Sequence, residues 1–300
     1  MTGLLPPPPE VDRAAPAAPV RRRRLPRRIR RHRTRALVVG LLTTVVLVVA
    51  MLPLAYLTTL AFMQQSDVLD GGVLPSTLTL DNWRDYWARL PLTGFFVNSA
   101  IAAGLGTLLS LAVATPAAYA IVRFRTGGSV LPAFVLSAFI APPVVAVVPM
   151  FFLLRWIGLL NDPVGLAVVY GLVNVSVATW LLQSFVARIP VELEEAAQID
   201  GAGALRTLVS VVLPLLAPGL VATGIVLAIL NVNEFLLALT VTQSPDSQTL
   251  PVVISLFQGD RGVQFGQMAA ASLTAMLPVY VGAVLVQRWL VGGLADGAVK

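Results

Sequence analysis

The chain has 300 residues, of which 57% are hydrophobic and only 12% are charged, and its mean hydropathy is +0.82. Soluble domains carry about 25% charged residues, so this composition excludes an ordinary soluble enzyme. The sequence contains no cysteine, which excludes disulfides, thiol nucleophiles and zinc–thiolate sites. Its single histidine, His32, stands among arginines, so we predict no catalytic residue and no metal site in this chain.

Long uncharged windows separate the charged residues. Each of six such windows exceeds the roughly 20 residues that a helix needs to cross a bilayer. The sequence therefore predicts an all-α polytopic membrane protein with six transmembrane helices. The spans are expected at about residues 36–62, 95–122, 131–154, 164–185, 215–240 and 268–290, within a transmembrane domain over 36–300.

The first 35 residues form an arm rich in proline and arginine. It holds eleven of the 21 Lys and Arg residues, at positions between Arg13 and Arg35. Such a segment cannot bury a core, and we predict a disordered arm over 1–35. The positive-inside rule places it in the cytoplasm, and six spans return the C-terminus to the same side. No aromatic residue interrupts the basic run to stack on bases, which favours membrane lipid over nucleic acid as its partner.

The only lysine, Lys300, is the last residue, so the chain has no G-x-x-x-x-G-K-[ST] phosphate loop. ATP-driven work would need the nucleotide site of another subunit. We therefore predict no cofactor in this chain.

Between the first two predicted spans, Trp83, Tyr86 and Trp87 follow one another at i, i+3 and i+4. This spacing places three rings on one helical face. An interfacial helix is the favoured interpretation, and a platform that stacks on sugars is the alternative.

Two predicted spans contain polar or helix-breaking residues. Pro142 and Pro143 interrupt the third span, and broken helices in membranes line water or protein, so they are candidates for a pathway lining or for a purely structural kink. In the fifth span, Glu234 is flanked by Asn231 and Asn233. An intramembrane acid is by default a functional hypothesis. We favour the alternative of a structural pair with Arg261 or with an arginine of a partner subunit.

The longest charged stretch between two spans covers residues 188–214 and is predicted to be cytoplasmic; we call it the docking loop. Pro190 suits the first position of a helix, carboxylates at 192, 194 and 195 suit its first turn, and Gly201 supplies a stop. An amphipathic pattern from Leu205 to Leu213 predicts a second helix. The small residues Ala196 and Ala197 would admit a partner surface, while an elbow packed on its own bundle is equally compatible with the residues.

These residues match a known pattern. Glu195-Ala196-Ala197, Gly201 and Val211-x-Leu213-Pro214 resemble the EAA loop of binding-protein-dependent ABC importer permeases. The segments NVNEFLLALT (231–240) and GGLADGAVK (292–300) are similar to carbohydrate-uptake permeases of the maltose-transporter inner-subunit type. The resemblance covers roughly residues 82–300, and the leucines at 205 and 208 depart from the bulkier aromatic residues that are frequent in the family.

The resemblance implies a type I ABC importer permease fold and a transport subunit of the bacterial cytoplasmic (inner) membrane, without enzymatic activity of its own. It implies as partners a second permease subunit, two ATPase subunits that hold ATP and Mg, and an extracytoplasmic solute-binding protein. Carried over by position, Glu195, Ala196, Ala197 and Gly201 would dock on the ATPase, and Leu213 and Pro214 would fix the return to the fifth span.

By resemblance the solute is a sugar, with glycerol phosphate esters or polyols as the alternative. A self-contained secondary transporter is a remote alternative, because the spans carry one acid and show no internal repeat. A membrane scaffold with a cytoplasmic docking loop is a third hypothesis, which would tolerate substitutions in the spans but need the loop. In the importer, Gly201→Asp would wedge a charged side chain into a tight turn and uncouple transport.

Overall fold

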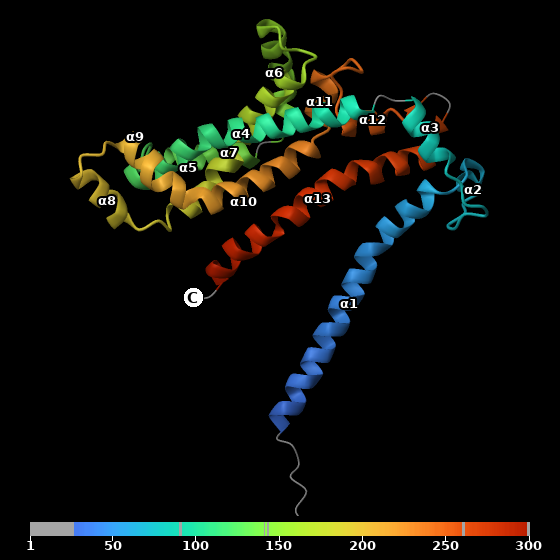
Figure 1. The fold of residues 1–300 in the computed structure, drawn as a ribbon, viewed down its shortest axis with the longest axis horizontal. Helices are drawn as coiled ribbons and strands as arrows, with labels where there is room; N and C mark the ends of the chain where they lie inside the picture. Colours follow the sequence, from blue (N-terminus) through green and yellow to red (C-terminus); the bar gives the residue numbers. More distant parts are fainter. Residues whose placement is uncertain (1–26, 90–91, 141, 143, 260–261, 299–300) are drawn as a thin grey trace, which may run out of the picture. The chain divides into compact units, whose positions relative to one another are not determined.

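The computed structural model describes residues 27–89, 92–140, 142, 144–259 and 262–298, and the chain divides into two compact units, residues 1–54 and 55–300. The elements in chain order are α1 (Arg27–Ala61), α2 (Gln65–Leu69), α3 (Asp81–Arg89), α4 (Leu92–Phe124), α5 (Val130–Ile140), α6 (Val144–Ile157), α7 (Pro163–Val186), α8 (Val191–Ile199), α9 (Ala204–Thr207), the π-helical turn η1 (Leu208–Val212), α10 (Leu213–Val232), α11 (Leu236–Val241), α12 (Leu250–Ser255), β1 (Gln258–Gly259), β2 (Gly262–Val263) and α13 (Phe265–Ala298) (Figure 1). Among the described residues, the regular structure is helical apart from the short antiparallel pair β1–β2, in which Gln258 faces Val263.

Helix α1 carries the first apolar segment. The predicted arm lies outside the described residues up to position 26, and α1 begins within it at Arg27. From Leu37 to Leu52 its large apolar side chains are exposed in this chain, which suits a helix surrounded by lipid or by a partner.

Within the described residues, four helical segments are long and apolar enough to cross a membrane: Leu37–Ala61, Leu92–Phe124, Pro163–Val186 and Ala204–Val232. The region of the third predicted span instead contains two shorter helices, α5 and α6, which are separated around Pro142. Prolines withdraw backbone donors and so favour such a break. Pro143 lies outside the described residues. Helix α13 runs through the region of the sixth predicted span.

Helices α4, α7 and α10 pack against one another and form the centre of the second unit (Figure 1). Their shared core includes Ala118 of α4, Leu182 and Val186 of α7, and Leu216 of α10, all of them buried. Lipid is as apolar as these side chains, so the association depends on close packing and on hydrogen bonds between helices more than on hydrophobic burial.

Close packing is most pronounced between α4 and α7. A Cβ at Gly106 would lie 2.8 Å from the Cβ of Tyr170, and one at Gly171 would lie 2.9 Å from the Cβ of Leu109. Ser110 adds a hydrogen bond across the same contact, since its hydroxyl donates to the carbonyl of Gly171 at 3.0 Å. Only glycine lets the two backbones approach this closely, so α4 and α7 are held together as a pair.

At the end of α7 that contains Pro163, the segment 242–250 is held to the bundle by polar side chains. Asn161, with φ +66°, accepts hydrogen bonds through Oδ1 from the amides of Gln243 and Ser244, each at 2.8 Å. On α4, Asn98 donates to the carbonyls of Asp246 and Gln248 at 2.8 and 3.0 Å. This end of α4 is thereby tied to the segment that leads into α12.

Helix α3 differs from the predicted interfacial helix in two of its three rings, because Trp83 is half-buried against the cluster that contains Leu60 and Met63. Trp87 is exposed, but Tyr86 is only 1% exposed and packs with Phe95, Leu250 and Val253. The amphipathic pattern could not show that residues of α4, and of α12 far along the sequence, cover Tyr86. The Tyr86 hydroxyl has no hydrogen-bond partner among the described residues, and burial raises the pKa of Tyr86 to about 12.

We expect Tyr86→Phe to keep or raise the free energy of unfolding near neutral pH, by at most about 1 kcal/mol, because it removes an unpaired buried hydroxyl. In the unfolded chain Tyr86 ionises near its ordinary pKa of 10.0, whereas in the folded chain it stays neutral up to about pH 12. Its contribution to stability is therefore complete below pH 10 and is lost as the pH rises toward 12. Thermal unfolding of both proteins in detergent at pH 7 and pH 11 checks this, and an equal loss of stability in the two proteins at pH 11 would contradict it.

Candidate functional site

The docking loop is a helix, a tight turn and a second helix. Pro190 occupies the N-cap of α8, one position earlier than predicted, with Glu192 and Glu194 in the first turn of that helix. The helix ends at Ile199 with Asp200 as its C-cap, and Gly201 follows with a φ of +83°. The amide of Gly201 donates to the carbonyl of Gln198 at 3.0 Å, and the amide of Ala202 donates to that of Ala197 at 2.9 Å. These bonds satisfy the last carbonyls of the helix as a glycine C-cap does.

Gly201 is needed for its backbone conformation and not for space. A Cβ at this position would meet no atom of the described residues within 4 Å. The expected wedging of an aspartate into the turn is therefore wrong in its physical reason. The substitution is unfavourable because of backbone strain, since residues with a side chain rarely adopt a φ of +83°.

The loop exposes the residues that the resemblance selects. Glu195 and Ala196 are exposed, whereas Ala197, three residues after the buried Glu194, is half-buried. Two large apolar side chains beside them, Ile199 and Leu205, are 87% and 75% exposed. We did not predict Ile199 as a site residue, although its place beside the turn glycine in a charged loop was a usable signal. Exposed apolar side chains on a polar loop are typical of a surface that binds another protein.

The second helix of the loop continues into α10 without a break at Pro214. Helices α9, η1 and α10 follow one another from Ala204 to Val232, with Leu213 and Pro214 exposed in the first turn of α10. Pro214 has no backbone donor, and the wider π-helical turn just before it alters the hydrogen-bond pattern there. Of the predicted amphipathic stripe, Leu208 and Val212 are buried while Val209 is exposed.

A buried polar cluster anchors α8 to the bundle. Glu194, at 3% exposure, is the one buried residue of that helix. Its carboxylate accepts a hydrogen bond from the Tyr119 hydroxyl at 2.9 Å and forms an ion pair with Arg123, Nε to Oε1 at 2.6 Å. A second guanidinium nitrogen of Arg123 donates to the carbonyls of Val186 and Ile189 at 3.0 and 2.6 Å. We call Tyr119, Arg123 and Glu194 the clasp; we had not predicted Tyr119 or Arg123 as site residues.

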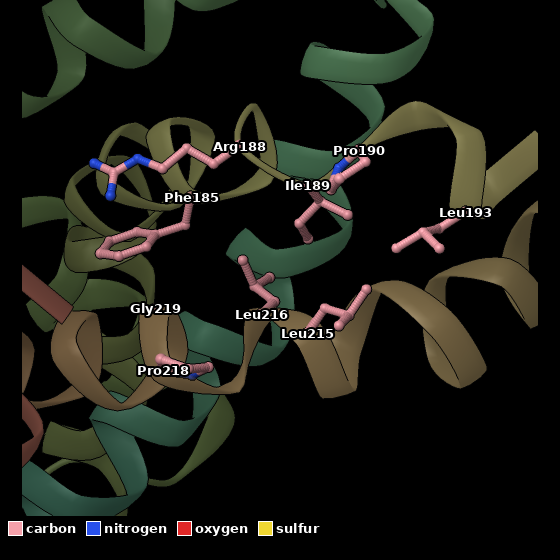
Figure 2. Close-up of a pocket in the computed structure, with 9 residues that line it drawn as sticks. All are labelled: Phe185, Arg188, Ile189, Pro190, Leu193, Leu215, Leu216, Pro218 and Gly219. Carbon is pink, nitrogen blue, oxygen red and sulfur yellow. The ribbon is translucent and has the colours of Figure 1, made fainter. Parts of the chain in front are cut away.

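Beside the clasp, a cavity of about 320 Å³ opens between the start of the docking loop and α10 (Figure 2). The Arg188 guanidinium lies over the Phe185 ring, 5.3 Å from its centroid. Leu193 of α8 and Leu215 of α10 line the opposite side. The cavity is mostly apolar, and it separates the start of α8 from α10. The contact between α8 and α4 is made by the clasp.

Among the predicted polar residues of span five, Asn231 lies in the core. It is 3% exposed. Its Nδ2 donates to the Ala103 carbonyl at 3.3 Å and to the Thr107 hydroxyl at 3.2 Å, and its Oδ1 accepts from Asn174 at 2.7 Å. The amide thus joins α4, α7 and α10 at one point, and these contacts leave it no free donor for a solute.

Glu234 and Asn233 lie where α10 gives way to α11. We had expected one continuous span over 215–240, but the Glu234 carboxylate accepts hydrogen bonds from the amides of Leu237 and Ala238, each at 3.0 Å, and so begins a new helix. The Tyr170 hydroxyl donates to the same carboxylate at 3.3 Å. Arg261, the predicted partner, lies outside the described residues. Asn233 is exposed and lines a cavity of about 710 Å³ with residues of α12 and α13.

A family model described as "Binding-protein-dependent transport system inner membrane component" matches residues 106–295, which include the docking loop. A putative ABC transporter permease protein of Streptomyces antibioticus is 39% identical over 76% of this chain and all of that protein. The trehalose/maltose transport system permease protein MalG of Thermococcus litoralis is 32% identical over 84% of this chain and 92% of its own length.

A solved structure shares the fold. The crystal structure of a bacterial ABC transporter involved in the import of the acidic polysaccharide alginate superposes with a TM-score of 0.70 and 21% sequence identity, covering 86% of this chain and 97% of that one.

Proposed function

Because this chain belongs to the family of inner membrane components of binding-protein-dependent transport systems, we propose that it is a permease subunit of an ATP-driven sugar importer that couples to its ATPase through the docking loop. One observation carries the proposal. Glu195 and Ala196 of the EAA segment are exposed on α8, while the only buried side chain of that helix, Glu194, ties it to the bundle. A loop that transmits movement from a partner needs an exposed face that binds the partner and a buried attachment to the transmembrane helices.

We propose six transmembrane spans with both termini in the cytoplasm. The four apolar helices would supply four spans, α5 and α6 together would supply another, and α13 the last. The docking loop then lies in the cytoplasm, on the same side as the arginine-rich arm. The break around Pro142 would face the pathway or a partner, because an interrupted helix must find hydrogen bonds away from lipid.

The proposed complex contains this chain, a second permease subunit, two ATPase subunits and an extracytoplasmic solute-binding protein. ATP and Mg bind on the ATPase, since this chain has no phosphate loop. Glu195, Ala196, Ala197 and Gly201 would dock on the ATPase, and Leu213 and Pro214 would connect the loop to α10. Closure of the ATPase would then move the spans between inward-facing and outward-facing arrangements.

The proposed substrate class is carbohydrate. It is supported by the trehalose/maltose permease, which covers most of this chain. Asn233 beside the larger cavity offers the kind of amide that hydrogen-bonds to sugar hydroxyls, whereas the described residues lining that cavity include no cation for a phosphate ester. Stimulation of ATP hydrolysis by a panel of disaccharides, glycerol phosphate and polyols, each with the solute-binding protein, separates the sugar proposal from its alternative.

The proposed coupling is tested by purifying the complex from detergent through this chain. We expect the ATPase and a second permease to co-purify with the wild type. Glu195→Ala, which removes an exposed charge from the docking face, should lower the retained ATPase about tenfold, as loss of an interface hot spot does. Asp246→Ala removes an exposed carboxylate near α12, away from the docking loop, and should leave ATPase retention unchanged. Recovery of the wild type alone, with solute transport in liposomes that needs no ATP, would contradict the proposal in favour of a secondary transporter.

A further inference from the structure

Within the docking loop, helix α8 has one buried side chain, Glu194, while α9 and η1, which α8 also contacts, continue into α10. Helix α8 is nine residues long, and most of its side chains are exposed. The cavity of Figure 2 separates its first turn from α10. A displacement of α8 by a bound partner can therefore reach α10 through α9 and η1, and it reaches α4 through Glu194.

The clasp joins that attachment to three segments. Arg123, near the end of α4, binds the carboxylate of Glu194 on α8, the Val186 carbonyl at the end of α7, and the Ile189 carbonyl in the connection between α7 and α8. Tyr119 holds the other carboxylate oxygen from one turn earlier on α4. Both oxygens of Glu194 are therefore bound by α4.

A buried charged pair of this kind makes a stiff link. Apolar side chains can slide over one another at small cost, whereas separating Arg123 from Glu194 would leave a buried charge uncompensated. Charge-assisted hydrogen bonds are also short and directional, so they restrain rotation as well as distance. Helix α4, which is 33 residues long, runs from this point to Asn98, whose side chain donates to the carbonyls of Asp246 and Gln248. A movement of α8 is thus passed along a continuous helix.

We propose that the clasp of Tyr119, Arg123 and Glu194 transmits the movement of the docking loop into α4 and α7, and so sets how many ATP molecules are hydrolysed for each solute moved. This inference rests on the proposed function and assigns positioning roles to three residues outside the exposed docking face. Severing the clasp leaves the docking face intact, so the ATPase should remain bound and continue to hydrolyse ATP while transport falls.

The test uses the full importer reconstituted in liposomes, with ATP hydrolysis and solute uptake measured on the same preparation. In Arg123→Gln we expect the ratio of ATP hydrolysed to solute moved to rise at least about fivefold, the lower end of the factors typical of coupled sites. Arg123→Lys keeps the charge but cannot make all three contacts, and should give a smaller rise. The matched control is Arg125→Gln, which alters an exposed arginine two residues along the chain and should leave the ratio at the wild-type value.

A second measurement separates force transmission from simple stability. The chain contains no native cysteine, so an Arg123→Cys/Glu194→Cys variant can be bridged by a bifunctional thiol reagent in complexes whose other subunits lack cysteine. The ratio of ATP hydrolysed to solute moved should be raised before bridging and should return toward the wild-type value after bridging.

An unchanged ratio in Arg123→Gln would overturn the inference. A proportional loss of hydrolysis and transport with release of the ATPase would also overturn it, since the clasp would then serve docking alone. Failure of the proposed function has a different signature, because the wild type itself would then bind no ATPase and show no ATP-dependent uptake.

Discussion

Gly201→Val is expected to lower ATP-dependent uptake at least about tenfold while the chain remains in the membrane. The reason is the φ of +83° at this turn, which a β-branched residue adopts only with strain of about 1–3 kcal/mol. To relieve that strain the turn must change, and α8 would then point its exposed face in another direction. Uptake into liposomes, with the amount of membrane-inserted chain measured in parallel, checks this expectation.

Gly201→Asn is the matched control for this turn. Asparagine tolerates the left-handed region better than any β-branched residue, and an added Cβ has open space among the described residues. It should therefore keep most of the uptake. Gly201→Asp should fall between the two variants, because its penalty comes from backbone strain and charge and not from crowding. Equal loss in the asparagine and valine variants would show that side-chain volume, not backbone conformation, limits this position.

Asn231→Leu is expected to lower the free energy of unfolding by about 2 kcal/mol or more. The substitution removes three hydrogen bonds to α4 and α7, and interhelical bonds of this kind contribute roughly 0.6 kcal/mol each in membranes. It also leaves Thr107 and Asn174 with unpaired groups in the core, which adds to the cost. Thermal unfolding in detergent and the yield of folded subunit measure the effect.

Asn233→Leu makes the same substitution two residues along the chain. The Asn233 side chain, at the C-cap of α10, is exposed, and its amide donates to the Ile229 carbonyl of that helix at 2.7 Å. We expect its stability to stay close to that of the wild type. A variant of Asn231 with native stability and impaired uptake would contradict the structural role and return Asn231 to the pathway candidates.

The sequence predicts much of the fold because charge is costly in lipid. Uncharged windows locate the long helices α1, α4, α7 and α10, and Pro142 predicts the interruption between α5 and α6. The docking loop is predictable for a similar reason, since local residues such as Gly201 determine its turn. These features depend on contacts close in sequence or on the surrounding solvent.

Features that depend on distant contacts could not be predicted in this way. Glu194 and Glu195 stand side by side in the sequence, and the resemblance selects the second, yet the first is the buried anchor because Arg123 lies 71 residues away in the chain and beside it in the fold. Tyr86 likewise fits an interfacial pattern and is buried by α12 and α13. The break after Asn233 was not predicted, because Glu234 was considered only as a charge within a span. Its carboxylate instead accepts hydrogen bonds from amides in the first turn of α11.

The close approach of α4 and α7 at Gly106 and Gly171 also provides a reference distance for measurements on the transporter. Two helices in backbone contact cannot separate without opening a void, so spin labels placed on both would report the same spacing in every nucleotide state. Such a pair is a built-in calibration standard, against which a changing distance elsewhere can be attributed to the transport cycle and not to the label. The absence of native cysteine lets that standard be installed without background from this chain.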